Sequence, residues 1–348
     1  MKKQILLSSI FALGLVACSN EDKFTVSDTP ATVNAMIGAG TETRAQGASW
    51  DKGDAIGIAA WKPEVSPEYA KLSDYQEVMY NYYKNVKYVV SDIAKGSFNS
   101  TGTDIYFHVP ENIDFCAYYP YTESSSASVL PGEDGVITIN TDEGNKTTAS
   151  QKTIDFMYAH AIASHDNPTI SFTKANMYND NAFHHMMTCL KVVFKLGEGF
   201  EGQSFDNSIT IGMNGAKHNG TFNLRRFGWT EAVGEASDIV LFANGEKQYD
   251  VTNETITAEE GAKEVAFTLY LLPQQSKMTF PIEVSYPTSN GSKVVEYVGT
   301  IYRDLESGKK YTYNINLNKK ALTVEEASIV DWENKTPGKN DAVMQTKE

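Results

Sequence analysis

Apolar and polar residues alternate in short runs along most of the chain, and the runs are rich in Val, Ile, Thr, Tyr and Phe. Alternation with a period of two is the pattern of a β-strand with one buried face, and these residue types suit a pleated, half-buried surface. Clusters of Gly, Pro, Asn and Ser separate the runs and are typical of turns. The pattern therefore predicts an all-β protein. The expected strands are Ala31–Ile37, Ile56–Ala60, Val86–Val90, Ile105–Val109, Phe115–Tyr119, Val136–Ile139, Ile170–Phe172, Phe183–Leu196, Ser208–Ile211, Gly220–Leu224, Ile239–Phe242, Val265–Leu271, Met278–Ser285, Val294–Ile301, Tyr311–Leu317, Leu322–Val324 and Ile329–Trp332.

The start of the chain has a different pattern, that of an export signal. Lys2 and Lys3 precede an apolar run from Ile5 to Val16, which is too short to span a bilayer, and small residues and Cys18 follow. A cysteine at the first mature position is typical of a lipoprotein, whose thiol carries a diacylglycerol. Several acyl chains together anchor a protein firmly, because each buried methylene contributes about 0.8 kcal/mol. The alternative is an ordinary secretory signal followed by an incidental cysteine.

The 348 residues are too many for one ordinary core once the signal is removed, so we expect two β domains. The acidic balance, 30 Lys and Arg against 44 Asp and Glu for a net charge of −14, argues against nucleic acid as a partner. The expected division is a signal peptide at 1–17, a lipid tether with a removable first strand and a cleavage loop at 18–45, an N-terminal β domain at 46–165, a C-terminal β domain at 166–332 and a polar tail at 333–348.

A flexible segment follows the first expected strand. Residues 38–47 are small and polar, with a single basic residue, Arg44, before Ala45. Such a segment is typical of an exposed loop and is accessible to proteases. The isolated arginine is a candidate for trypsin-like cleavage, although the local sequence alone favours an ordinary arginine in a linker.

The residue order holds no enzymatic motif, and we expect no catalytic residue, metal or cofactor. His184 and His185 are adjacent, so on a strand their side chains point to opposite faces and do not readily grip one metal. Helical HExxH, GxSxG and nucleotide-binding glycine patterns are absent. Cys116 and Cys189 lie in apolar runs. Two buried free thiols are the favoured interpretation, and a bridge between the two halves is the alternative.

Short motifs spread over nearly the whole chain occur in a characteristic order. They are Trp50 with Gly53–Ile58, Ile105–Phe107, Phe115–Tyr121, Asp155–Ala159, Phe183–His185 with Leu190–Phe194, Leu271–Gln274 and Gly308–Tyr313. Together with the lipoprotein leader, these motifs resemble the fimbrillin-like family, the lipoprotein pilins of Bacteroidales type V pili, which include the Mfa-like fimbrillins.

The resemblance implies two tandem transthyretin-like β-sandwich domains and export to the outer membrane and cell surface. It also implies cleavage after Arg44 by a trypsin-like maturation protease and assembly with other pilin subunits into a fimbrium by donor-strand exchange. Release of Ala31–Ile37 would expose strand edges and an apolar groove, which a strand of a neighbouring subunit could fill. Adhesion to a host or glycan ligand is a further implied role.

The tail at 333–348 is a poor donor strand by composition, because it contains Pro337 and Gly338 and few apolar residues. If residues 322–332 complete the second domain instead, the chain accepts a donor without being a good one, so stalk and tip positions both stay open. The alternative function is a surface glycan-binding lipoprotein that uses exposed aromatic residues such as Trp61, Tyr80 and Trp229.

Overall fold

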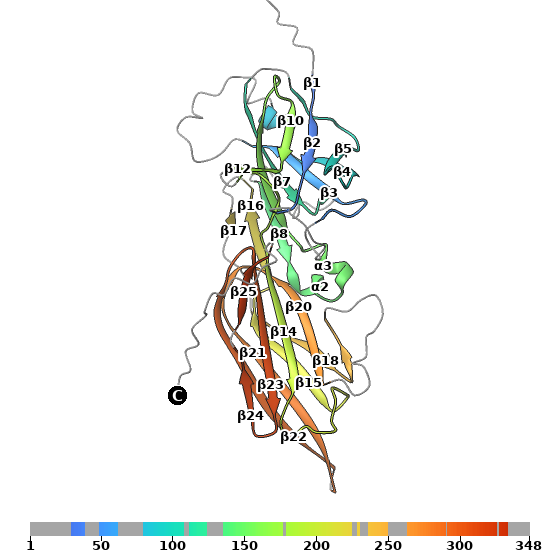
Figure 1. Ribbon diagram of the computed structural model, residues 1–348, viewed down its shortest axis with the longest axis vertical. Helices are drawn as coiled ribbons and strands as arrows, with labels where there is room; N and C mark the ends of the chain where they lie inside the picture. The colour runs from blue at the N-terminus through green and yellow to red at the C-terminus, as the bar shows by residue number, and fades with distance from the viewer. Residues whose placement is uncertain are drawn as a thin grey trace, which may run out of the picture.

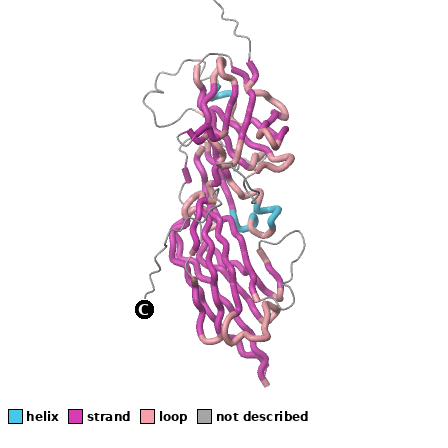
Figure 2. Tube along the Cα trace, viewed as in Figure 1, coloured by secondary structure: helices cyan, strands magenta, loops and turns pink. Residues whose placement is uncertain are grey.

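The alternating runs form strands in a computed structural model of the chain. The structure describes residues 29–38, 49–61, 79–107, 111–123, 135–176, 179–224, 228–229, 236–249, 263–289, 291–325 and 327–332. Figure 1 shows an elongated molecule with an N-terminal body stacked on a C-terminal body, and Figure 2 shows that strands make up nearly all of both. The predicted all-β class is confirmed, whereas its assignment as tandem transthyretin-like domains stays a prediction.

The N-terminal body is built on an eight-stranded sheet in the order β10-β2-β5-β4-β3-β7-β9-β13. Neighbouring strands are antiparallel except β2 and β10, which are parallel. β7 is buried at every position because a core covers each of its faces. The strands are β2 (Thr32–Ala35), β3 (Ala55–Ala60), β4 (Val86–Asp92), β5 (Ser97–Ser100), β7 (Ile113–Tyr119), β9 (Met157–Ala163), β10 (Thr169–Phe172) and β13 (His184–His185).

Three smaller pairings flank this sheet. Strand β1 pairs with β6, β11 pairs with β12, and a three-stranded sheet has the order β17-β16-β8. The last sheet covers the back of β7, where Ile137 and Phe222 pack in one core with Tyr118. Because β8 precedes the eight-stranded sheet's last strands and β16 follows them, this sheet joins the two halves of the sequence. The bounds are β1 (Thr29–Pro30), β6 (Tyr106–Phe107), β8 (Val136–Asn140), β11 (Lys174–Asn176), β12 (Asn179–Asp180), β16 (Asn219–Asn223) and β17 (Gly228–Trp229).

Two five-stranded sheets form the C-terminal body. One contains β20, β14, β23 and β24, with β25 also paired to β23, and the other has the order β19-β18-β15-β21-β22. Leu190, Val192 and Phe194 alternate into the core between the sheets, as their spacing predicts. The bounds are β14 (Thr188–Leu196), β15 (Ile209–Ala216), β18 (Ser237–Ala243), β19 (Glu246–Lys247), β20 (Glu264–Leu271), β21 (Gln274–Thr288), β22 (Gly291–Leu305), β23 (Lys309–Asn318), β24 (Ala321–Val324) and β25 (Ser328–Asp331).

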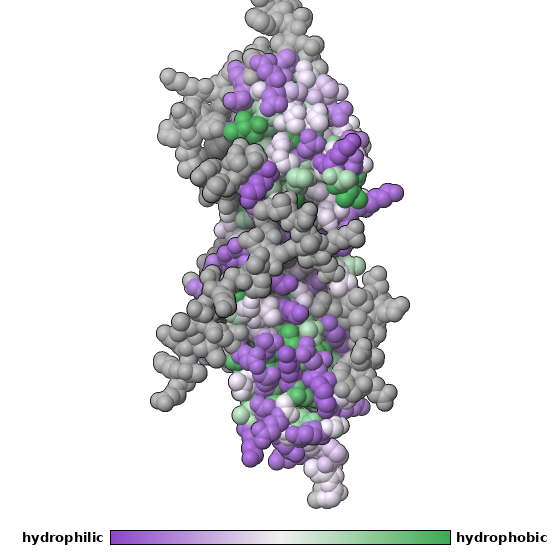
Figure 3. Space-filling model, viewed as in Figure 1, coloured by the Kyte–Doolittle hydropathy of each residue, from purple (hydrophilic) through white to green (hydrophobic). Residues whose placement is uncertain are grey.

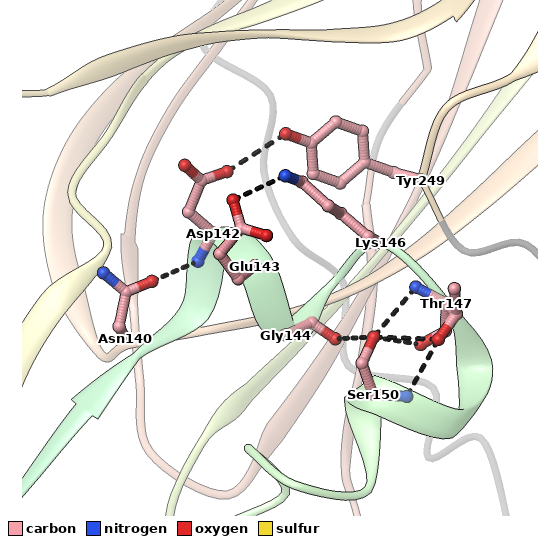
Figure 4. Close-up of polar contacts among 8 residues, drawn as sticks. All are labelled: Asn140, Asp142, Glu143, Gly144, Lys146, Thr147, Ser150 and Tyr249. Carbon is pink, nitrogen blue, oxygen red and sulfur yellow. Dashed lines mark hydrogen bonds and ion pairs between the residues drawn. The ribbon is translucent and has the colours of Figure 1, made fainter.

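A short helical arm follows β8 and reaches the C-terminal body (Figure 4). It consists of α2 (Thr141–Gly144) and α3 (Thr148–Gln151). Asn140 caps α2, a reciprocal Thr147–Ser150 pair caps α3, and the hydroxyl of Tyr249 donates to Asp142 at 3.0 Å. The two caps satisfy backbone groups at the helix starts that would otherwise lack partners. The bond from Tyr249 ties the arm to the C-terminal body.

The edge of β20 is covered by this arm. The side-chain amide of Asn145 donates to the Tyr270 carbonyl and accepts from the Tyr270 N–H, both at 2.7 Å. Gln151 donates to the Thr268 carbonyl. Two side-chain amides thus take the place of a neighbouring strand, which blocks an edge that could pair with another chain.

Strand pairing does not change at residue 165, where the sequence suggested a domain boundary. β9 ends before this point and β10 begins after it, and both belong to the eight-stranded sheet. The reason is the parallel pairing of β10 with β2, a contact between distant segments that local composition does not reveal. Cys116 and Cys189 are buried and no disulfide joins them, as expected. No helix among the described residues is long and apolar enough to cross a membrane.

Candidate functional site

Strand β2 occupies an interior slot of the eight-stranded sheet, between β10 and β5. On one side the Met36 N–H donates to the Phe172 carbonyl at 2.9 Å, and on the other the Ala35 N–H donates to the Gly96 carbonyl at 2.8 Å. A strand that is bonded on both sides leaves two open edges when it departs. The slot would therefore present backbone donors and acceptors from both β10 and β5.

The side chains of this segment alternate as the sequence predicts. Val33, Ala35 and Ile37 point into the core and are 1%, 0% and 6% exposed, whereas Met36 points outward and is 43% exposed. The buried face belongs to the N-terminal core. A strand that fills the slot needs small or medium apolar side chains at three alternate positions.

The indole of Trp50 links β2 to the floor of the slot. Its Nε1–H donates to the Ala35 carbonyl at 2.9 Å. Its ring meets Phe98, Phe183 and Tyr119 edge-on, with centroids 5.3, 5.2 and 5.5 Å away. Edge-on aromatic pairs have a preferred geometry, so the cluster holds the indole in one orientation. The donor recognises a backbone carbonyl and thus any strand in the correct register.

A glycine lets β5 approach β2 closely. Gly96 has φ +63°, a conformation that favours glycine, and a Cβ atom there would lie 2.4 Å from the Ala35 carbonyl oxygen. The carbonyl of the same glycine accepts the Ala35 N–H. Gly96 is therefore required for the bond that closes the slot on this side.

A tight turn positions Trp50 just ahead of β3. The Asp51 N–H donates to Asp54 Oδ2 at 2.7 Å, and the Tyr119 hydroxyl donates to Asp54 Oδ1 at 3.1 Å. Gly53 has φ +94°, a conformation that favours glycine in such a turn. Burial raises the pKa of the Asp54 carboxyl. The two bonds to Asp54 fix the chain just after the predicted cleavage loop.

The predicted processing residues, Cys18, Arg44 and Ala45, lie outside the described residues. The segment that contains Arg44 is nevertheless fixed at both ends. At one end the Gly38 N–H donates to the Phe183 carbonyl at 2.8 Å, and at the other Trp50 is buried. A cut in this segment would leave β2 joined to the body by non-covalent contacts alone.

The last described residue, Trp332, lies where the two bodies meet. The Trp332 ring stacks on His185, with centroids 4.3 Å apart and planes at 2°. The backbone N–H of Trp332 donates to the Gly308 carbonyl at 2.8 Å. His185 Nδ1 lies 2.7 Å from Asp155 Oδ1. β24 and β25 both pair with β23, so these two strands complete the C-terminal body. The tail at 333–348 lies outside the described residues.

The aromatic residues suggested as glycan contacts are not exposed platforms. Trp61 and Tyr80 are 4% and 6% exposed. Trp229 is half-buried and donates to the Met186 carbonyl at 2.7 Å. That interpretation is wrong for these residues because aromatic side chains fill the β cores here. In the part of the chain that the structure describes, no three His, Cys, Asp or Glu side chains gather as metal ligands would.

Residues 43–332 match the family described as fimbrillin-like. The chain belongs to the fimbrillin-like family. The matched range begins beside Arg44, so β1 and β2 precede it.

One relative of this fimbrillin-like chain is a Bacteroides uniformis protein named "Putative fimbrium subunit Fim1C", 26% identical over 97% of each chain. Two solved structures share the fold, and each is named "putative cell adhesion protein". That from Bacteroides ovatus is 23% identical, with 89% of this chain and 100% of the other covered and a TM-score of 0.58. That from Bacteroides uniformis is 22% identical, with 87% and 98% covered and a TM-score of 0.56.

Proposed function

We propose that this chain is a subunit of a cell-surface fimbrium that assembles by strand exchange at the β2 slot. In this proposal the precursor is exported as a lipoprotein anchored in the outer membrane through Cys18. A trypsin-like protease cuts after Arg44, β2 leaves, and a strand of another subunit replaces it. The observation that carries the proposal is the position of β2, which is bonded on both sides and directly precedes the segment containing Arg44.

The relatives support the same role. The chain matches the Bacteroides uniformis protein that is named as a fimbrium subunit over 97% of both lengths. The family match covers both bodies. Adhesion enters the proposal through the names of the two solved structures.

The energetics favour exchange over simple loss of the strand. Burial of Val33 and Ile37 contributes about 1.5–3 kcal/mol each, and Ala35 contributes less. Ordering a free strand costs about 1–2 kcal/mol per residue, so a short, unlinked β2 is weakly held. An empty slot exposes the same apolar floor to water. A longer donor that also pairs with β10 and β5 is therefore the more stable occupant.

Whether this chain supplies a donor strand distinguishes a stalk subunit from a tip subunit. β24 and β25 pair within the chain's own C-terminal body, so the candidate donor in this chain is the tail at 333–348. If the tail pairs in a neighbour's slot, the chain is a stalk subunit. If it does not, the chain accepts a donor and ends the fibre.

An arginine-specific protease tests the proposal on protein that lacks residues 1–18. The chain has four arginines, of which Arg225 and Arg226 are adjacent and Arg303 lies within β22. We expect a first cut after Arg44 by intact mass, followed by loss of the N-terminal peptide and growth of oligomers in size-exclusion chromatography. Arg44→Ala should remain an uncut monomer. Oligomers formed equally well by Arg44→Ala would refute this route.

The same experiment distinguishes the two positions in the fibre. Deletion of residues 333–348 should abolish oligomer growth after cleavage if the tail is the donor. The truncated chain should still accept a donor from full-length protein, because its slot is intact. Cleavage and peptide loss without oligomers in the full-length protein would assign it to the tip.

A further inference from the structure

A pocket of about 530 Å³ opens on the N-terminal body, away from the β2 slot. It lies between the segment that leads into β4 and the turn that follows β5, two strands that Figure 1 places together in the upper body. Its volume is within the range of small-molecule sites in proteins, about 300–1,000 Å³. The lining residues that matter here are Tyr82, Lys84, Lys87, Thr101, Gly102 and Tyr121.

The aromatic ring of Tyr82 lies at the pocket and is held in place by its neighbour. Tyr82 is 71% exposed, whereas most aromatic side chains of this protein are buried. Its ring packs edge-on against Tyr83, with centroids 5.3 Å apart, and the Tyr83 hydroxyl accepts from the Tyr106 N–H at 2.9 Å. The anchored neighbour holds the exposed ring in place. A rigid, exposed tyrosine offers contact area at low entropic cost, as recognition surfaces do.

Positive charge gathers at the same pocket, although the chain as a whole has a net charge of −14. Lys87 Nζ lies 4.9 Å from the centre of the Tyr121 ring and 3.2 Å from Glu123 Oε1. The Glu123 side chain is 73% exposed. An ion pair this exposed is weak because water screens it. Another carboxylate can therefore replace that of Glu123 beside Lys87.

We propose that this pocket binds a sugar that carries a carboxylate, such as a terminal uronic or sialic acid of a glycan. The polarised C–H groups of the sugar ring pack on the face of Tyr82, which is electron-rich. Its carboxylate pairs with Lys87 in place of Glu123, and its own hydroxyls can bond to Thr101 and Thr103, which also line the pocket. Glu123 therefore competes with the ligand for Lys87.

Gly102 provides a way to close the pocket without disturbing the fold. A Cβ atom added there meets no heavy atom within 4 Å. A large side chain at this position therefore meets no clash at its Cβ atom, and it would take up space in the pocket that Gly102 lines.

Tyr302 provides a matched control on the other body. It is also 71% exposed, and Lys277 Nζ lies 5.1 Å from its ring centre. The pair lies on β21 and β22, outside the pocket lining. This pair combines an exposed tyrosine with a lysine, as the pocket does, but it does not line a pocket.

The test uses the uncut protein lacking residues 1–18, with binding followed by calorimetry or saturation-transfer NMR. The probes are N-acetylneuraminic acid and glucuronic acid, compared with glucose and N-acetylglucosamine. We expect the acidic sugars to bind at least about 10-fold more tightly, because a charge-assisted bond to Lys87 is lost with neutral sugars. Tyr82→Ala should weaken binding about 10-fold, Gly102→Trp should abolish it, and Glu123→Gln should tighten it about 2- to 5-fold.

Tyr302→Ala should leave the affinity unchanged. The proposal is overturned if the acidic sugars do not bind at millimolar concentration, if neutral sugars bind equally well, or if Gly102→Trp binds like the parent. An equal loss in Tyr82→Ala and Tyr302→Ala would also overturn it, because binding would then follow exposed tyrosines in general. The uncut monomer needs no strand exchange, so this result is independent of the assembly proposal.

Discussion

Replacing Trp50 with phenylalanine tests how firmly the slot holds β2. The substitution removes the donor that bonds the Ala35 carbonyl at 2.9 Å, and this carbonyl belongs to a residue with no exposed surface. Leaving a buried acceptor without its partner costs about 1–3 kcal/mol. The smaller ring adds about 1 kcal/mol for the void that it leaves. We therefore expect Trp50→Phe to lower the free energy of unfolding by about 2–4 kcal/mol, which most domains survive.

The same loss should appear in the release of β2 after cleavage. If about 2 kcal/mol of it acts on β2, the dissociation constant of the cut N-terminal peptide rises about 30-fold. The assay labels that peptide, cuts the chain after Arg44 and follows the peptide that remains bound during size-exclusion chromatography. Urea unfolding of the uncut variant gives the total loss of stability.

Trp229→Phe is the matched control, because Trp229 donates a similar bond to the Met186 carbonyl at 2.7 Å, outside the slot. It should lose stability in urea and release the peptide at the parent rate. Equal peptide release by the two variants would refute the reasoning. So would an unchanged release from Trp50→Phe in a variant that is clearly destabilised.

Three further changes have defined outcomes. Cys18→Ala should move the protein from the membrane to the soluble fraction of cells; unchanged membrane association would contradict the lipid anchor. Asn145→Leu should lower the free energy of unfolding by about 2–4 kcal/mol, since it leaves both backbone groups of Tyr270 without their partner; a loss below about 1 kcal/mol in urea would mean that water replaces the amide. Burial lowers the pKa of His218 from 6.5, so the fold favours its neutral form. Stability should therefore fall as the pH drops below about 6.5, and His218→Asn should flatten urea midpoints between pH 7 and 5.

Local pattern predicted many of the strands, although β5 and β9 were not among those expected. Val33, Ala35 and Ile37 face the core because alternation alone decides which face of a strand is apolar. The expected strands Met278–Ser285 and Val294–Ile301 lie within β21 and β22. These features depend on neighbours in sequence, which a single chain displays directly.

Pairing between distant segments was not visible in the sequence. Nothing in residues 32–35 indicates that their parallel partner is 169–172, and nothing in β8 indicates β16. Burial of aromatic residues was equally hidden, since the neighbours of Trp61 and Tyr82 in sequence do not show that one lies in a core and the other at a pocket. The β2 slot could therefore be identified only from the structure. The roles of Arg44 and Cys18 in processing were predicted from sequence motifs and family resemblance.

The position of Trp332 determines where tension on the tail would reach the fold. The tail starts from the joint between the bodies, beside His185, and not from the far end of the C-terminal body, where the β21–β22 hairpin projects (Figure 1). In a fibre in which the tail is the donor, tension enters at residue 332, beside that joint, and acts first on the pairing of β25 with β23 and on the stack with His185 of β13. The strands nearest the joint would therefore carry the load before those at the far end of the C-terminal body, over much of whose visible face Figure 3 shows hydrophilic side chains.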